Sequence, residues 1–137
     1  EIVVTAKRRS GQLIFTNATI SGIKVSVIID TGGETSIGNK SLQKRLRMRS
    51  SSLQQIKLID VTGKGVDADY GIAQNLQIGR ARFGQVPIAF SDIEPFKALK
   101  LNNKPALFLG MNALRNFDRM AIDFANRKIY FLLPKEA

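Results

Sequence analysis

Apolar and polar residues alternate along most of this chain, a pattern typical of strands that have one face in the core. The alternation is clear at residues 23–29, where Lys24 and Ser26 separate β-branched residues. The same reasoning predicts a chain that is mostly β, with strands at residues 13–15, 18–20, 23–29, 56–60, 67–78, 80–90, 106–109, 120–124 and 128–133.

Short turns are expected to join these strands into hairpins. The dipeptide Ser21-Gly22 predicts a tight hairpin, and residues 125–127 predict a closing one. The glycine-rich residues 61–66 predict a hairpin tip between two longer strands.

Two short helices interrupt the β pattern. The first is predicted at residues 41–48, with Ser41 as the N-cap and leucines four residues apart. The second is predicted at residues 111–117, with its apolar side chains facing inward. Residues 94–104 are interpreted as a loop with one helical turn, and residues 34–38 as a short strand or turn.

With 137 residues, the chain is long enough for one domain around a single core. Residues 1–10 start with a short β-like run and then become basic, so we interpret them as an N-terminal arm or a frayed edge strand. Residues 11–137 form the predicted single domain. Because the chain begins at Glu1 rather than Met, we expect a trimmed or mature form.

The composition narrows the chemistry that the chain can perform. It contains no Cys and no His, which excludes disulfides, thiolate zinc sites, Cys nucleophiles and Ser-His arrangements. Catalysis would have to use Asp, Glu, Lys, Arg, Tyr or hydroxyl groups. We expect no cofactor and no metal.

Basic residues exceed acidic ones, which gives a formal net charge of +10. No aromatic residues that could stack on bases are interleaved with the basic clusters, so we expect no specific nucleic-acid recognition. A weak attraction to anionic surfaces is expected, and polyanion binding remains an alternative function. The two clusters are Lys7, Arg8 and Arg9, and Lys40, Lys44, Arg45, Arg47 and Arg49.

One stretch carries candidate chemistry, because an apolar strand ends there in Asp30-Thr31-Gly32-Gly33. The preceding β-branched residues suit a buried strand, and the two glycines allow a tight turn. A carboxylate at the edge of the core is costly unless it has partners or a function. An ordinary strand followed by a turn would also explain this tetrapeptide.

The other acidic residues are interpreted as structural. Asp92 ends a strand whose pattern loosely echoes the strand before Asp30, which indicates an internal two-fold repeat. Neither Thr nor Ser followed by Gly comes after Asp92, so it is a weak candidate for a second catalytic acid. We interpret Asp67 and Asp69 as a solvated strand edge that discourages strand pairing.

The order of these features resembles the retropepsin-like aspartic proteases. A hairpin strand runs into Asp30-Thr31-Gly32, a short helix and a Gly-bearing hairpin follow, and Phe108-Leu109-Gly110 leads into a second helix. The closing hairpin is similar to that of bacterial single-domain members. The resemblance implies an all-β, retropepsin-like closed barrel or sandwich with two short helices and a flap hairpin.

The resemblance also implies a function and roles for individual residues. The chain would be an aspartic endopeptidase that activates water by general acid/base catalysis on a protein or peptide substrate. Because only one Asp-Thr-Gly is present, Asp30 of two subunits would form the catalytic pair of a homodimer. Thr31, Gly32 and Gly33 would support the loop, Leu109 and Gly110 would lie beneath it, and the flap over the substrate would comprise Thr62, Gly63, Lys64, Gly65 and Val66.

The chain departs from the family pattern at two positions. Gly33 cannot offer the carboxylate a hydroxyl donor, so activity is expected to extend to mildly acidic or near-neutral pH. Met111 stands where viral relatives have an Arg that pairs with an acid, here Glu34. Arg115 or Arg119 could take over that role, and the sequence leaves the choice open.

A non-catalytic peptide-binding or dimerisation module with the same fold is the alternative to a protease. Substrate sequence and dimer strength are not determined by these patterns. Since bacterial relatives are often exported or membrane-anchored, we expect a periplasmic or membrane-anchored extracytoplasmic location.

Overall fold

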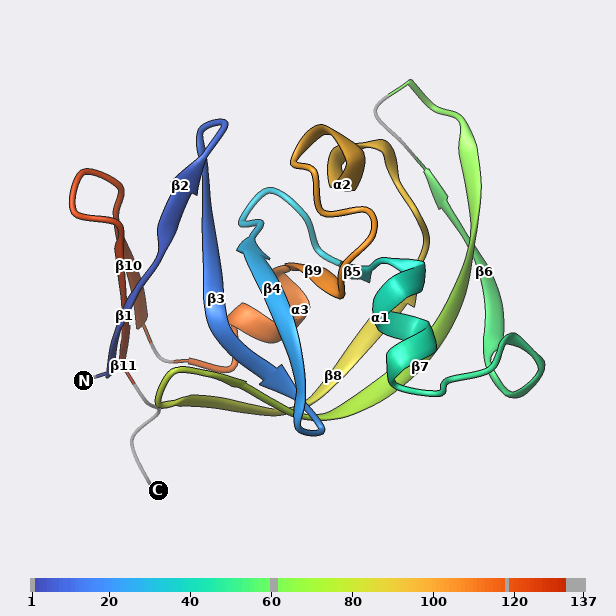
Figure 1. The fold of residues 1–137 in the computed structure, drawn as a ribbon, viewed down its shortest axis with the longest axis horizontal. Coiled ribbons are helices and arrows are strands. Elements are labelled where there is room, and N and C mark those ends of the chain that lie inside the picture. The colour runs from blue at the N-terminus through green and yellow to red at the C-terminus, as the bar shows by residue number, and fades with distance from the viewer. Residues whose placement is uncertain (1, 60–61, 118, 133–137) are drawn as a thin grey trace.

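The computed structural model describes residues 2–59, 62–117 and 119–132 (Figure 1). Within these ranges, the helical elements are α1 (Lys40–Arg45), the 3-10 turn η1 (Ser50–Ser52), α2 (Glu94–Ala98) and α3 (Met111–Leu114). The strands are β1 (Ile2–Thr5), β2 (Lys7–Arg9), β3 (Gln12–Ile20), β4 (Ile23–Ile29), β5 (Ser36–Gly38), β6 (Gln54–Ile59), β7 (Gly65–Ile78), β8 (Ala81–Phe90), β9 (Ala106–Leu109), β10 (Arg119–Asp123) and β11 (Lys128–Leu132).

Eight of the strands form one sheet that closes on itself. Its order is β2-β3-β4-β9-β5-β8-β7-β6, and an additional pairing of β3 with β7 completes a ring. In that pairing, residues 18–20 run antiparallel to residues 76–78. The expected all-β, barrel-like fold with short helices is confirmed, and the helical turn expected within residues 94–104 is α2.

The strand order reveals two similar halves. The hairpins β3–β4 and β7–β8 lie on either side of a central antiparallel pair, β5 and β9. Each inner hairpin strand runs parallel to one central strand, β4 to β9 and β8 to β5. The internal repeat indicated by the sequence is therefore present in the topology.

The hydrogen bonds at the ends of the two inner strands correct one detail of that repeat. The Asp30 N–H donates to the Leu109 carbonyl oxygen at 2.9 Å, and the Ser91 N–H donates to the Gly38 carbonyl oxygen at the same distance. The residue that occupies the place of Asp30 in the second half is therefore Ser91 rather than Asp92.

The core is divided in two by β4, the strand that precedes Asp30. Val27 and Ile29 belong to the larger cluster, in which the rings of Phe83, Phe117 and Phe131 pack together. A smaller cluster under α2 includes Ile28. β4 is thus buried on both faces at its end, which explains why its alternation gives way to a continuous apolar run.

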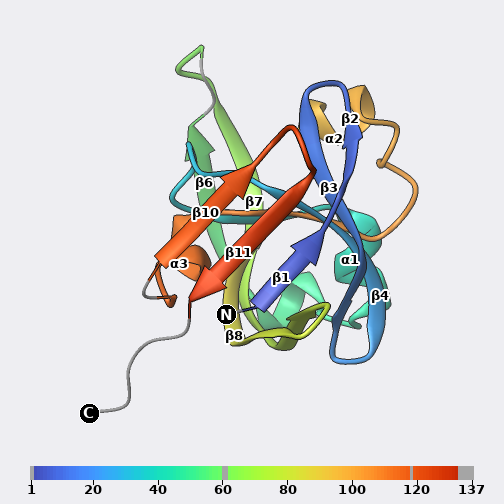
Figure 2. The ribbon, with the colours of Figure 1, turned by 90° about the vertical axis from the view of Figure 1, so that its left-hand side faces the viewer.

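The first strand, β1, and the closing hairpin form the remaining sheet. β11 lies between β1 and β10, and β2 pairs with β3 of the larger sheet. Figure 2 shows this three-stranded sheet in front of the barrel. Residues 2–5 and 7–9 are therefore paired strands. None of the described helices is long and apolar enough to cross a membrane.

Helix α1 starts earlier than its sequence pattern predicted. Its N-cap is Asn39, whose side-chain oxygen accepts a 2.9 Å hydrogen bond from the Leu42 N–H, and the prediction of Ser41 was wrong. The buried Asn39 amide also donates to the carbonyl oxygens of Leu101 and Lys104. These bonds to a distant loop favour Asn39, because burial demands that every polar atom of its amide be paired.

Candidate active site

Asp30 lies at the exit of β4, in the loop that leads to β5. Its backbone is held on both sides, since its N–H donates to Leu109 and its carbonyl oxygen accepts from the Gly33 N–H at 3.3 Å. Asp30 is half-buried, whereas Thr31 and Gly32 are exposed. The structure therefore presents the carboxylate at the surface of the barrel on a fixed backbone.

Gly33 lies directly against the Asp30 carboxylate. A Cβ atom added at Gly33 would be 2.6 Å from Oδ2 and 3.2 Å from Cγ of Asp30. A Cβ at Gly32 would approach no nearer than 3.7 Å. The observed position of the carboxylate thus requires a residue without a side chain at Gly33.

Leu109 and Gly110 lie next to this loop, at the end of β9 and directly after it. β9 runs parallel to β4, with Leu109 opposite Ile29. The following helix bonds to the loop as well, since the Met111 N–H donates to the Gly33 carbonyl oxygen at 2.8 Å. The Asp30 loop is therefore supported by backbone hydrogen bonds along most of its length.

We expect Gly110→Ala to destabilise the fold by about 1–3 kcal/mol through overpacking. Its Cβ would lie 2.7 Å from the Thr35 carbonyl oxygen and 2.9 Å from that of Glu34, and backbone atoms cannot move aside as a side chain can. Urea unfolding measures the effect. Gly65→Ala is the control, because the nearest atom to its Cβ would be a flexible Lys57 carbon at 3.4 Å. Equal stability of the two variants would contradict the prediction.

A polar pair that sequence patterns did not reveal, the buried Ser36 and the half-buried Asn112, supports the same segment. The Ser36 hydroxyl accepts from the Gly110 N–H at 3.0 Å and donates to the Asn112 side-chain oxygen at 2.6 Å. The Asn112 amide donates in turn to the Pro87 carbonyl oxygen. Ser36 and Asn112 lie far apart in the sequence, so only the fold brings them together.

The open choice of partner for Glu34 is resolved. Arg115 donates two hydrogen bonds of 2.6 Å to the two Glu34 carboxylate oxygens. Both side chains are more than half exposed, so this pair contributes at most about 1 kcal/mol to stability. It joins the loop after Asp30 to the end of α3.

The predicted hairpin tip lies between the end of β6 and the start of β7. These strands pair from Gln54 opposite Tyr70 to Ile59 opposite Gly65, and the described tip residues 62–64 are exposed. In Figure 1 the tip extends beyond the barrel, on the upper side, towards which the β4–β5 loop also points. Part of the predicted tip, Val61, lies outside the described residues.

A pocket of about 290 Å³ adjoins Asp30 and includes residues that the sequence did not indicate. It is lined by residues 11–13, by residues 29–32 and by Ile122 and Phe124 of the closing hairpin. The hairpin is anchored nearby, since the Arg8 guanidinium donates to the Phe124 carbonyl oxygen. In the sequence, the available signal was an aromatic residue directly before the predicted turn at residues 125–127. In the structure, this residue, Phe124, is 54% exposed.

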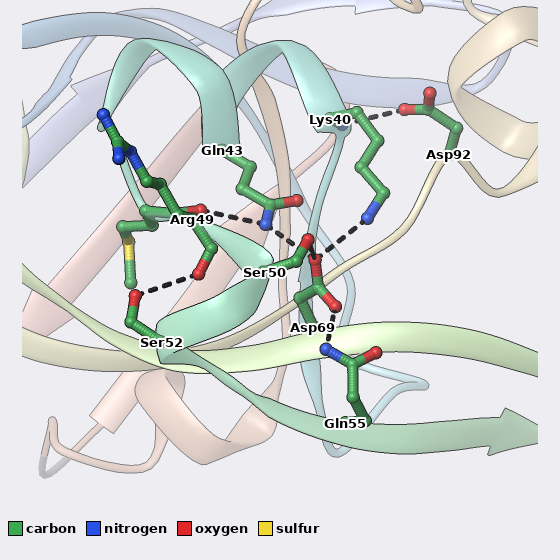
Figure 3. Close-up of polar contacts among 9 residues, drawn as sticks. Lys40, Gln43, Arg49, Ser50, Ser52, Gln55, Asp69 and Asp92 are labelled. Carbon is green, nitrogen blue, oxygen red and sulfur yellow. Dashed lines mark hydrogen bonds and ion pairs between the residues drawn. The ribbon is translucent and has the colours of Figure 1, made fainter.

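Asp69 is not the solvated edge residue that we expected. It is only 4% exposed, and its carboxylate accepts hydrogen bonds from Ser50, Gln43, Gln55 and Lys40 (Figure 3). These bonds, led by that of the Ser50 hydroxyl, hold the Asp69 pKa well below its usual range. The local pattern was misleading because α1 and η1 cover this part of β7.

The other two acids have structural contacts. Asp67 is exposed and pairs at 2.9 Å with Lys57, which lies opposite it on β6, so it is solvated but does not prevent strand pairing. Asp92 accepts a 2.8 Å hydrogen bond from the Lys40 N–H at the start of α1. Within the described ranges, no three acidic side chains lie close enough together to hold a metal ion.

Comparison with known proteins identifies the family. Residues 16–113 match the family model described as aspartyl protease. The crystal structure of a retropepsin-like aspartic protease from Rickettsia conorii has a TM-score of 0.69 and 19% sequence identity, covering 95% of this chain and 88% of that chain. The retroviral protease-like domain of Ddi1 from Leishmania major has a TM-score of 0.52 and 16% identity, covering 87% and 93%.

No curated protein matches the sequence. At these identities the two solved structures establish a shared fold, and the family model establishes membership because it spans more than half of the chain. The chain belongs to the aspartyl protease family and has the retropepsin-like fold.

Proposed function

We propose that the protein is a homodimeric aspartic endopeptidase whose active site combines Asp30 of two subunits. The observation that carries this proposal is the unequal pair of strand ends. One half of the barrel presents Asp30 at the surface, while the equivalent place in the other half holds Ser91, which is 4% exposed. A second carboxylate must then come from another copy of the chain.

The chemistry follows from two adjacent carboxyl groups. Two carboxylates at close range cannot both ionise easily, so they share one proton, as the two catalytic carboxyl groups of aspartic proteases do. The ionised carboxylate removes a proton from water, and the protonated one donates a proton to the carbonyl oxygen of the scissile bond. The exposed Thr31 and Gly32 leave room for the partner loop and for the substrate backbone.

The β6–β7 hairpin would act as the flap. Its tip residues Thr62, Gly63 and Lys64 are exposed, and Gly63 has a φ of +85°, which suits a turn that favours glycine. Gly65 and Val66 begin the return strand. Closure of such a hairpin over a bound peptide would exclude water from the reacting groups.

A subunit-mixing experiment tests the shared active site. Increasing amounts of Asp30→Asn subunits are added to a constant amount of wild-type protein, and cleavage of a fluorogenic peptide library is measured. Mixed dimers would hold one carboxylate, so activity should fall steadily towards zero. Unchanged wild-type activity, with exchange of subunits verified by sedimentation, would contradict the proposal. Peptide binding without any cleavage would favour the non-catalytic module.

We expect Gly33→Ala and Gly33→Ser to lower peptide cleavage, because each added Cβ displaces the Asp30 carboxylate from its observed position. The serine hydroxyl can also donate to that carboxylate and favour its charged form. Gly33→Ser should therefore shift the pH profile to lower pH than Gly33→Ala does. Both profiles are measured as kcat/KM against pH. Coincident profiles would show that a hydroxyl at this position does not govern the pH range.

A further inference from the structure

The C-terminal end of α1 and the turn after it border two adjoining hollows. The larger, of about 700 Å³, is lined by Lys40, Gln43, Lys44, Arg47, Met48 and Arg49 together with Ser50. The smaller, of about 330 Å³, shares Arg47 and Met48 with it and adds Arg45, Leu46, Ile23 and Ile72. We call the two hollows together the α1 groove.

The α1 groove is strongly positive. Among the described residues that line it, five are cationic and none is acidic. Asp69 lies below the groove and accepts a hydrogen bond from Lys40, but it is only 4% exposed. Among the described residues, no carboxylate pairs with Lys44, Arg45, Arg47 or Arg49. The groove therefore attracts anionic groups from solvent.

A buried acceptor lies between these cations. Gln43 is 6% exposed, and its side-chain nitrogen donates to Asp69 and to the Met48 carbonyl oxygen. Its side-chain oxygen is buried and accepts no hydrogen bond from any described residue. Figure 3 shows Gln43 between Lys40 and Arg49. An occupant that brings an N–H or O–H donor as well as negative charge would satisfy both features.

The smaller hollow has an apolar floor. Ile72 on β7 is 52% exposed, and Leu46 and Met48 lie partly buried beside it. Within the part of the chain that the structure describes, no aromatic residue lines either hollow. The groove therefore offers no ring on which a nucleobase could stack, whereas an aliphatic side chain could pack against Ile72, Leu46 and Met48.

We propose that the α1 groove binds an extended acidic segment of another protein in which aliphatic residues lie next to carboxylates. The carboxylates would contact Lys44, Arg47 and Arg49, and an aliphatic side chain would cover Ile72. A backbone N–H of the segment would donate to the Gln43 oxygen. This binding is separate from peptide cleavage, and in a protease it would select substrates at a distance from the scissile bond.

Fluorescence anisotropy tests the proposal in the Asp30→Asn background, so that the probe stays intact whether or not the protein is a protease. The probe is a labelled dodecapeptide in which Asp and Glu flank two leucines. The groove variant carries Lys44→Gln, Arg47→Gln and Arg49→Gln. The matched control carries Lys24→Gln, Arg80→Gln and Arg82→Gln, which are exposed positions outside the groove and give the same net charge.

We expect the groove variant to bind the probe at least about tenfold more weakly, and the matched control to change affinity by less than about threefold. Equal losses in the two variants would show a general charge effect and overturn the proposal. Circular dichroism verifies that both variants are folded. A measurement without variants uses a probe with Asn and Gln in place of the acids, and equally tight binding of this neutral probe would also overturn the proposal.

The aliphatic contact and the class of partner have their own tests. Ile72→Ser should weaken binding of the leucine-containing probe several-fold and leave a serine-substituted probe unaffected.

Oligo-dT and vesicles containing phosphatidylserine serve as competing anions. If either binds more tightly than the probe and loses affinity in the groove variant, the occupant is not an acidic protein segment.

Discussion

Asp30→Asn should abolish peptide cleavage, with a loss of about a thousandfold or more, while the fold persists. An amide at this position cannot exchange a proton with water or with the scissile carbonyl, and such proton transfers contribute about 10²–10⁴-fold to rate. The fold should persist because the contacts that hold Asp30 in place use its backbone N–H and carbonyl oxygen, which the substitution leaves unchanged.

The matched control for Asp30→Asn is Asp92→Asn. Asp92 also follows an inner hairpin strand, yet it lies beside the start of α1 and caps the Lys40 N–H. Asparagine keeps the oxygen that accepts from the Lys40 N–H, so this substitution should change stability little and leave cleavage within about twofold of wild type. Wild-type cleavage by Asp30→Asn, or equal loss of cleavage in both variants, would refute the assignment of Asp30 as the catalytic acid/base.

The second large effect is expected for Asp69→Asn, which should lower the free energy of unfolding by about 3 kcal/mol at neutral pH. Four side chains donate hydrogen bonds to this buried carboxylate, and an amide would turn an N–H₂ group towards some of those donors. The Lys40 charge would also lose its partner, 3.3 Å away. Urea unfolding measures the difference.

The pH dependence of this effect has a defined sign. Hydrogen bonds from Ser50, Gln43, Gln55 and Lys40 lower the Asp69 pKa in the folded protein, so the folded state binds protons less readily than the unfolded chain. The stabilisation is complete above the usual aspartate range, near pH 4, and is lost as the pH falls below it. The difference in free energy of unfolding between wild type and Asp69→Asn should therefore become smaller at acidic pH.

Asp67→Asn is the control for Asp69→Asn, because Asp67 lies two residues away on the same strand and pairs with Lys57 at an exposed position. Its stability should stay within about 0.5 kcal/mol of wild type at all pH values. If the difference in free energy of unfolding between wild type and Asp69→Asn did not change with pH, the four donors would not be stabilising the charged form of Asp69.

Much of the barrel could be predicted from local patterns, because strand alternation and turn residues act over short distances. The hairpin at Ser21-Gly22 is an example, since both residues adopt positive φ angles as the tight turn requires. The apolar run before Asp30 correctly placed that residue at the end of a buried strand. The order of these elements then pointed to the family.

Positions that depend on long-range packing were less accessible. The N-cap of α1 is Asn39 rather than Ser41, because a distant loop provides partners for the Asn39 amide. Ser91 rather than Asp92 occupies the counterpart of the Asp30 position, which became clear only from the hydrogen bonds to the central strands.

The sequence by itself determined the β architecture, the exclusion of thiol and imidazole chemistry, and the choice of Asp30 as the candidate acid, because these depend on composition and on neighbouring residues. The tertiary structure decided the burial of Asp69, the pairing of Glu34 with Arg115 and the placement of Ile72 beside Arg45 and Arg47 in the α1 groove. Each of these joins segments that are distant in the chain, and their mutual placement is set by packing of the whole barrel rather than by local residue order.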